Sequence, residues 1–189
     1  KARAEAAPIA PDTSPHPEAP GKAEGIDRTA KLYIGGAQKR PDSGYSYAVI
    51  TKGRTIGLAG LGNRKDIRNA VEAAHAAKGW GKATGHNRAQ VLYFLAENLS
   101  QRATEFTGRL KAAGVPKAGD EVEASIRRAF WYAAQADKFD GAVHSTKSAH
   151  VTLAMNEPYG VMGIACPTDA PLLGFLSLVL PAIAMGNRV

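Results

Sequence analysis

The sequence is poor in cysteine: Cys166 is the only one among its 189 residues. A single cysteine allows no disulfide within the chain and no metal site built from several cysteines. The first residues are rich in alanine and proline and lack the apolar core of a secretory signal. We therefore expect a protein of the reducing cytoplasm.

Long hydrophobic runs are also scarce. The best candidate for a membrane span, residues 170–185, has 16 uncharged residues, whereas a spanning helix needs about 20. Pro171 and Pro181 interrupt this stretch. We predict a buried core helix there and no association with a membrane.

Positive charge exceeds negative charge, which gives the chain a formal net charge of +7. Such a charge attracts nucleic acid. The basic residues are nevertheless scattered, as in the pairs Arg64-Lys65 and Arg127-Arg128, and no basic run is interleaved with aromatic residues. We therefore expect solvated helix faces and no nucleic-acid partner, with a basic nucleic-acid-binding protein as the alternative.

Residues 1–30 contain five prolines, many alanines and almost no large apolar side chain. Such a segment buries too little surface to offset the entropy of ordering it. We predict a semi-rigid linker over residues 1–30 and a folded domain over residues 31–189. A linker at the front of the chain suggests a further module upstream.

The folded part begins with strand patterns and continues with helix patterns. Residues 31–40 alternate apolar and polar side chains around two glycines, which indicates a β-hairpin. Asn63 is a good helix cap, and Ile67, Val71 and Ala74 share one face of the helix that follows. Further strands are predicted at 45–50, 54–60 and 150–155. A helix is predicted at 87–114, with an apolar stripe of Val91, Leu92, Leu95 and Leu99. Another is predicted at 120–140, where Trp131 and Tyr132 are expected to pack.

The last forty residues differ from the rest. Residues 159–166 form an almost continuous apolar run, which suits a strand buried on both faces in a parallel sheet. Residues 172–185 are apolar on nearly every side, which predicts a helix that is covered all round. Pro171 suits the first position of this helix, Gly186-Asn187 is expected to stop it, and Arg188-Val189 is expected to begin another strand. One parallel strand needs parallel neighbours, so we interpret the chain as the front part of a longer doubly wound α/β domain. The alternative is that a partner chain supplies the missing layer.

Two loops are candidate ligand sites. Gly60-Leu61-Gly62 lies between a strand and a helix, but Lys65 stands where a dinucleotide loop has its third glycine, so we predict an ordinary turn. The loop before Pro171 is more informative, because ligands of open α/β sheets bind beyond the carboxyl ends of strands. Cys166 has no histidine within ten residues, and Asp169 opposes thiolate formation, so a buried structural cysteine is expected.

Three motifs near the C-terminus give the chain a family resemblance. Residues 157–163 fit the pattern E-P-x-G-V-x-G, residues 167–171 the position of P-W-N-x-P, and residues 181–187 the pattern P-A-(L/I)-A-x-G-N. In order and spacing these motifs resemble those of the aldehyde dehydrogenase superfamily. Further matching stretches are "KLYIGGA" at 31–37, "DSG" at 42–44 and the segment from Asp66 to Leu99.

The resemblance implies the N-terminal part of the aldehyde dehydrogenase fold, incomplete in this chain. That part comprises a Rossmann-like NAD-binding domain and strands of an oligomerisation β-flap, to which residues 150–155 correspond. It implies an enzyme that oxidises aldehydes to carboxylic acids with NAD or NADP. The nucleophilic cysteine and the glutamate of the family lie beyond the matched segment, and Ala165, Cys166, Pro167 and Thr168 correspond to positions beside the cofactor.

Asp169 matches the asparagine of P-W-N-x-P, which donates a hydrogen bond to the oxyanion formed when the thiolate attacks. An ionised aspartate donates none, so Asp169 is predicted to be a degenerate oxyanion-hole residue, or else only the cap of the following helix. This change resembles the second, degenerate module of the two-module family 16 aldehyde dehydrogenases.

We therefore expect a non-catalytic module that packs against a catalytic aldehyde dehydrogenase module of the same protein, in a homo-oligomer, with a dimer favoured. The alternative is the front part of a catalytic module whose cysteine and glutamate lie downstream.

Overall fold

The computed structural model describes residues 28–189. The chain divides into two compact units, of which the first ends at Asn69 and the second runs from Ala70 to Val189. The predicted linker, residues 1–30, lies almost entirely outside the described residues.

The first unit contains two β-hairpins, as predicted. Strands β1 (Leu32–Ile34) and β2 (Ala37–Lys39) pair antiparallel, and so do β3 (Ser46–Thr51) and β4 (Arg54–Gly60). The turn between β3 and β4 places Lys52 at φ 50° and Gly53 at φ 73°. Two successive residues with positive φ match the right-handed twist of the flanking strands, which explains why a glycine stands in this turn.

Helix α1 (Arg64–Ala76) begins where the sequence predicts it. Asn63 Oδ1 accepts hydrogen bonds from the backbone N–H groups of Lys65 and Asp66, and the Asp66 carboxylate accepts the N–H of Asn63 in return. This reciprocal cap satisfies N–H groups that the helix itself leaves unpaired. Asp66 also accepts the N–H of Asp42, and the hydrogen bond from Lys65 lowers the pKa of the exposed Asp42 carboxyl.

The predicted apolar face of α1 is only partly buried. Ala74 is buried, whereas Ile67 and Val71 are 66% and 42% exposed. The three residues share one face of α1 as predicted, but no covering layer lies over Ile67 and Val71 among residues 28–189.

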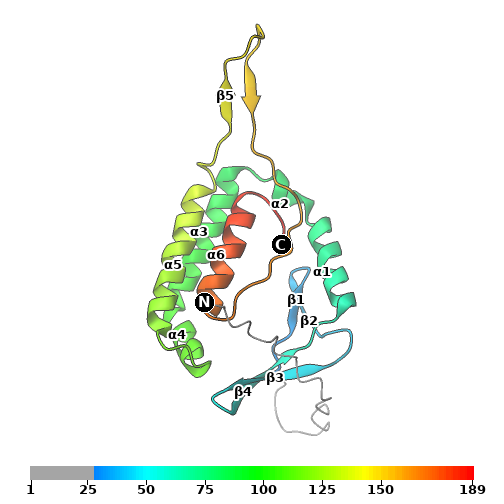
Figure 1. The fold of residues 1–189 in the computed structure, drawn as a ribbon, viewed down its shortest axis with the longest axis vertical. Helices are drawn as coiled ribbons and strands as arrows, with labels where there is room; N and C mark the ends of the chain where they lie inside the picture. Colours follow the sequence, from blue (N-terminus) through cyan, green and yellow to red (C-terminus); the bar gives the residue numbers. More distant parts are fainter. Residues whose placement is uncertain (1–27) are drawn as a thin grey trace, which may run out of the picture. The chain divides into compact units, whose positions relative to one another are not determined.

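The second unit is built on packed helices. Figure 1 shows α3 (Gly85–Gln101), α5 (Ala118–Gln135) and α6 (Pro171–Ala184) side by side. Alanines at their contacts let the backbones approach closely, and leucines fill the remaining space. The buried cluster comprises Ala89, Leu92, Ala96, Leu99, Ala129, Ala133, Ala136, Leu176, Leu180 and Ala184.

Two helix predictions need correction. The predicted helix at 87–114 is interrupted at Arg102, which separates α3 from α4 (Ala103–Ala112). Of its predicted stripe, Leu92 and Leu99 are buried, whereas Val91 and Leu95 remain exposed because only one side of α3 packs against the helices α5 and α6. Trp131 is 55% exposed, with its ring in an edge contact with Tyr132, so it is not the packing residue that was expected, whereas Tyr132 does pack against the core.

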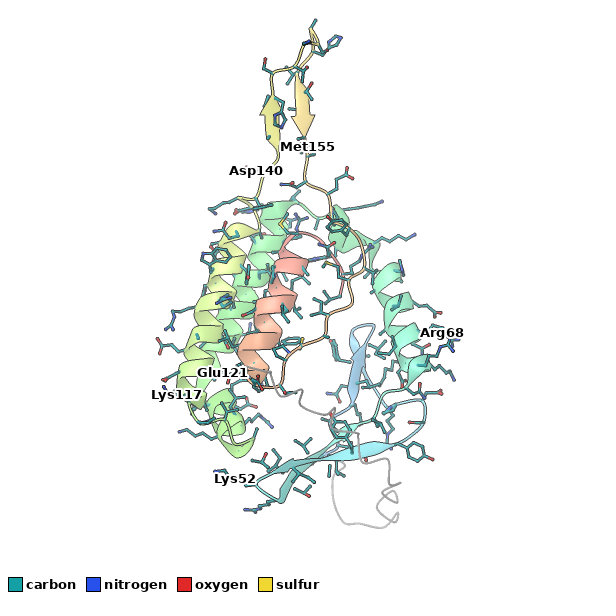
Figure 2. The ribbon with its side chains drawn as sticks, in the orientation of Figure 1. Lys52, Arg68, Lys117, Glu121, Asp140 and Met155 are labelled. Carbon is teal, nitrogen blue, oxygen red and sulfur yellow. The ribbon has the colours of Figure 1, made fainter. Side chains whose placement is uncertain are left out.

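A third hairpin extends beyond the helices of the second unit (Figure 1). Strand β6 (Thr152–Ala154), which was predicted, pairs antiparallel with β5 (Ala142–His144), which was not. Asn156 fixes the base of the hairpin, because its Nδ2 donates to the backbone oxygens of Asp140 and Phe139 over 2.8 and 3.3 Å. Figure 2 shows Asp140 and Met155 at this base.

The predicted buried strand at 159–166 forms only in part. Val161 makes a parallel bridge with Arg188, which confirms the strand–helix–strand order around α6. Elsewhere the run is not covered on both faces, and Cys166 is exposed, so the prediction of a buried cysteine was wrong. The physical reason is that the described residues supply a parallel neighbour at a single point.

Helix α6 begins at Pro171, as predicted. Leu176 and Leu180 are buried, but Phe175 and Leu178 are 47% and 43% exposed, so the helix is not covered all round in the described residues. Within residues 28–189, no helix combines the length and the apolar character that a membrane crossing needs.

Candidate functional site before helix α6

The candidate site is the loop at residues 165–169, which joins an extended segment to α6. The extended segment is tied to the chain beyond α6. Met162 N–H donates to Arg188 O, and Arg188 N–H donates to Gly160 O, both over 2.8 Å. The Asn187 side chain adds a further bond, because its Oδ1 accepts the N–H of Gly160 at 3.0 Å.

Asn187 is only 4% exposed, and Gly160 has φ 118°, a conformation that side chains disfavour. The glycine of the first family motif and the asparagine of the last therefore contact each other directly. The sequence pattern places Asn187 only at the end of the helix and predicts no contact between it and Gly160.

The N-terminal turn of α6 is capped by a residue far away in the sequence. Glu121 Oε1 accepts the N–H groups of Leu172 and Leu173 over 2.9 and 3.2 Å. The alternative that Asp169 caps α6 was wrong, because the cap position is Ala170 and no side chain at that position bonds to the helix. Sequence reasoning missed Glu121, since nothing in its local pattern connects it to α6.

Gly174 lets the loop fold back on α6. A Cβ atom at this position would lie 2.5 Å from Cγ of Pro167. Only glycine at position 174 therefore leaves room for the Pro167 ring. This contact places the middle of the 165–169 loop against α6.

The C-terminal end of α6 is held by α2 (Lys78–Lys82) and α3. The Trp80 indole N–H donates to Ile183 O, and Arg88 Nε donates to Ala184 O, both over 2.9 Å. Arg88 Nη1 also donates to Ala83 O. A cation at a helix C-terminus is favourably placed relative to the helix dipole.

The structure places the five predicted site residues, Ala165, Cys166, Pro167, Thr168 and Asp169, together in one exposed loop. The Asp169 carboxylate has no hydrogen-bond partner within residues 28–189. No group of three or more metal-ligating side chains occurs in the part of the chain that the structure describes.

The family resemblance puts NAD or NADP beside residues 165–168, and two observations bear on whether these residues fit the cofactor. The loop is accessible, and the Gly160–Asn187 and Glu121–Leu172 contacts fix it from both sides. However, one described cavity lies at Asn63, Arg64, Lys65 and Arg68, another lies at the base of the β5–β6 hairpin, and neither includes a residue of the loop. The loop therefore presents a fixed and exposed surface, and neither of these two cavities is lined by it.

The Gly60–Gly62 loop uses two of its backbone N–H groups for hydrogen bonds within the first unit. Gly60 N–H donates to Ala30 O and Leu61 N–H to Tyr45 O, over 2.7 and 2.9 Å. These donors are used within the unit, which agrees with the ordinary turn that was predicted.

Comparison with known proteins gives a consistent family. The chain matches the aldehyde dehydrogenase family over residues 46–189. It is 26% identical to vanillin dehydrogenase of Amycolatopsis over 165 residues, which cover 85% of this chain and 34% of that protein. It is 31% identical to betaine aldehyde dehydrogenase of Hordeum vulgare, over 82% of this chain and 34% of that protein.

The fold agrees with this match. The structure of PnpE in complex with nicotinamide adenine dinucleotide superimposes with a TM-score of 0.79 at 25% identity, over 84% of this chain and 34% of that one. The chain thus spans about a third of the length of these proteins, and it has the fold of their N-terminal part. The chain belongs to the aldehyde dehydrogenase family.

Proposed function

We propose that the chain is part of an NAD(P)-dependent aldehyde dehydrogenase, and that this part is a non-catalytic module with a structural or oligomerisation role. The observation that carries the proposal is Asp169. By resemblance to P-W-N-x-P, Asp169 matches the family's oxyanion-hole asparagine, and it lies in an exposed loop without a hydrogen-bond partner among residues 28–189.

The chemistry of a carboxylate explains why this position matters. The family asparagine donates an N–H to the developing oxyanion, whereas an ionised carboxylate accepts hydrogen bonds and donates none. Loss of one such donor costs about 10²- to 10³-fold in rate. A negative charge about 4 Å from the oxyanion adds repulsion of the order of a few kcal/mol at a surface-like dielectric. Asp169 is thus unsuited to stabilise the reaction that the family performs.

Substitution of Asp169 in the intact protein tests the proposal. We expect Asp169→Ala and Asp169→Asn each to leave kcat for aldehyde oxidation within about twofold, because the reaction takes place in another module and a missing donor is worth far more than this. Formation of NADH or NADPH is measured by absorbance, with Glu97→Gln on the exposed face of α3 as the control. A fall of about 10²-fold or more in Asp169→Ala, with unchanged circular dichroism, would show that this module is catalytic.

The alternative is the front part of a catalytic module whose cysteine and glutamate lie downstream. The intact contact between Gly160 and Asn187 favours it, because that contact would position the loop equally well in a working enzyme. The same experiment separates the two functions. A rise in kcat in Asp169→Asn would also support the alternative, since asparagine restores the donor. We further propose a cytoplasmic location, supported by the single cysteine.

We also propose that the β5–β6 hairpin joins this module to its partners, in a homo-oligomer or against the catalytic module of the same protein. The resemblance to the family β-flap and the exposure of Val143, Val151 and Leu153 (73%, 74% and 58%) support this role. Exposed edges of a two-stranded hairpin can pair with a further strand.

Polar substitution of the hairpin tests its role. We expect the double substitution Val151→Ser and Leu153→Ser to lower the mass measured by light scattering, because both side chains lose apolar surface at the contact. The control is Lys147→Ser, which lies in the exposed connection between β5 and β6. An unchanged mass in the double variant would contradict the proposal.

A further inference from the structure

The first turn of α6 receives its cap from another helix. Pro171 opens α6 and has no N–H, so Leu172 and Leu173 are the first residues of the helix that can donate. Both donate to the same atom, Glu121 Oε1. A carboxylate of α5 therefore holds the turn that directly follows the 165–169 loop, and Figure 2 shows Glu121 at this end of the helices.

Glu121 is well placed for this contact. It lies in the first turn of α5, so the N-terminal ends of two helices, α5 and α6, act on one carboxylate. Negative charge is favourable at a helix N-terminus. The Glu121 backbone is fixed as well, because its carbonyl oxygen accepts the hydroxyl of the fully buried Ser125 over 2.7 Å.

Apolar packing alone does not fix the turn in the same way. Leu172 contacts the main core cluster and a second cluster formed by Leu110, Ala118 and Val122. Hydrophobic contact is non-directional, whereas two hydrogen bonds to one oxygen constrain the direction of both N–H groups. The Glu121 carboxylate therefore fixes the orientation of the turn, whereas the Leu172 side chain holds the turn against the core.

We propose that Glu121 is a positioning residue, whose carboxylate fixes the 165–169 loop by holding the N–H groups of Leu172 and Leu173. The inference goes beyond the proposed function, because it concerns how the loop is held and applies to a catalytic and a non-catalytic module alike. It also gives the loop a mechanical link to α5, which leads at its other end to the β5–β6 hairpin.

Two readouts in the intact protein test the proposal without any assay of activity. Hydrogen exchange reports on the amides of Leu172 and Leu173, and pulse alkylation with N-ethylmaleimide, followed by mass spectrometry of the peptide, reports on exposed Cys166. We expect Glu121→Ala to accelerate exchange at both amides about 10- to 100-fold, the factor that corresponds to a hydrogen bond to a charged group. We expect the alkylation rate of Cys166 to change in the same variant.

Matched variants distinguish positioning from a general loss of packing. Glu123→Ala removes an exposed carboxylate from the same helix, where it pairs with Arg127, and should behave like the unsubstituted protein. Glu121→Gln keeps one acceptor oxygen without the charge, so exchange should rise less than in Glu121→Ala. Added acetate should slow exchange again in Glu121→Ala, because a free carboxylate can occupy the vacated position, whereas chloride at equal ionic strength should not.

Unchanged exchange and alkylation in Glu121→Ala would overturn the proposal, and so would an increase that neither acetate nor glutamine reduces. If Glu121→Ala does not fold, Glu121→Gln decides: faster exchange at Leu172 and Leu173 supports the proposal, and unchanged exchange contradicts it. Because neither readout involves Asp169 or turnover, failure of this inference is distinct from failure of the proposed function.

Discussion

The Leu180→Ala variant of the chain should lose about 2–5 kcal/mol in its free energy of unfolding. Leu180 lies on α6, is 1% exposed and belongs to the cluster that joins α3, α5 and α6. Truncation to alanine removes the transfer free energy of the buried atoms and leaves a cavity that the surrounding alanines cannot fill. Urea denaturation followed by circular dichroism gives the difference.

Leu178→Ala is the matched control for this substitution. Leu178 lies two residues earlier in the same helix but is 43% exposed. Its truncation changes helix propensity to the same extent but removes less buried apolar surface. We therefore expect the free energy of unfolding to fall by less than about 1 kcal/mol. Equal losses in the two variants would mean that α6 does not pack as described.

The Arg88→Met variant should lose about 2–3 kcal/mol in its free energy of unfolding, because two part-buried carbonyl oxygens lose a charged donor. Arg88 is half-buried and donates to Ala184 O and Ala83 O, which joins the C-terminal end of α6 to the loop before α3. Methionine preserves much of the length and the apolar contacts of the side chain, so the loss reports mainly on the hydrogen bonds. The measurement is again urea denaturation.

Two further variants show whether the loss in Arg88→Met comes from its hydrogen bonds to the carbonyl oxygens. Arg109→Met removes an arginine that is exposed and pairs with Glu105 on α4, and a loss of about 0.5 kcal/mol or less is expected there. Arg88→Lys keeps the charge but not the planar group that bonds in two directions. Its free energy of unfolding should therefore lie between those of the unsubstituted chain and Arg88→Met. A loss in Arg88→Met no larger than in Arg109→Met would contradict the described cap of α6.

Local signals in the sequence were enough for the elements whose causes are local. The two N-terminal hairpins follow from alternation and from glycine turns, and α1 follows from the cap at Asn63. Pro171 correctly marked the start of α6 because a proline has both the φ and the missing N–H that a first helical turn tolerates. The family followed from three short motifs and agrees with the match over residues 46–189.

Burial was predicted less well, because it depends on neighbours that local patterns do not contain. Ile67 and Val71 belong to an apolar helix face and Cys166 ends an apolar run, and all three are nevertheless exposed. An apolar stripe indicates that a helix face is suited to a core. Whether the face is buried depends on a second layer that packs against it. The same reason explains why the run at 159–166 forms one parallel bridge instead of a full strand.

Within the candidate site, the sequence identified the loop but not the contacts that hold it. The five predicted residues are consecutive, so their proximity needed no structure. The contacts of Glu121 with Leu172 and of Asn187 with Gly160 span 51 and 27 residues. No periodicity or spacing rule predicts a hydrogen bond over such a separation, and only the packing of α5 against α6 brings the partners together.

The hydrogen bond between Trp80 and Ile183 has a practical consequence. The chain has two tryptophans, and they differ in environment: Trp80 is half-buried against the last turn of α6, whereas Trp131 is 55% exposed on α5. Fluorescence emission that iodide does not quench therefore arises mainly from Trp80. That signal is an intrinsic optical probe of the end of α6, readable in real time and without a label.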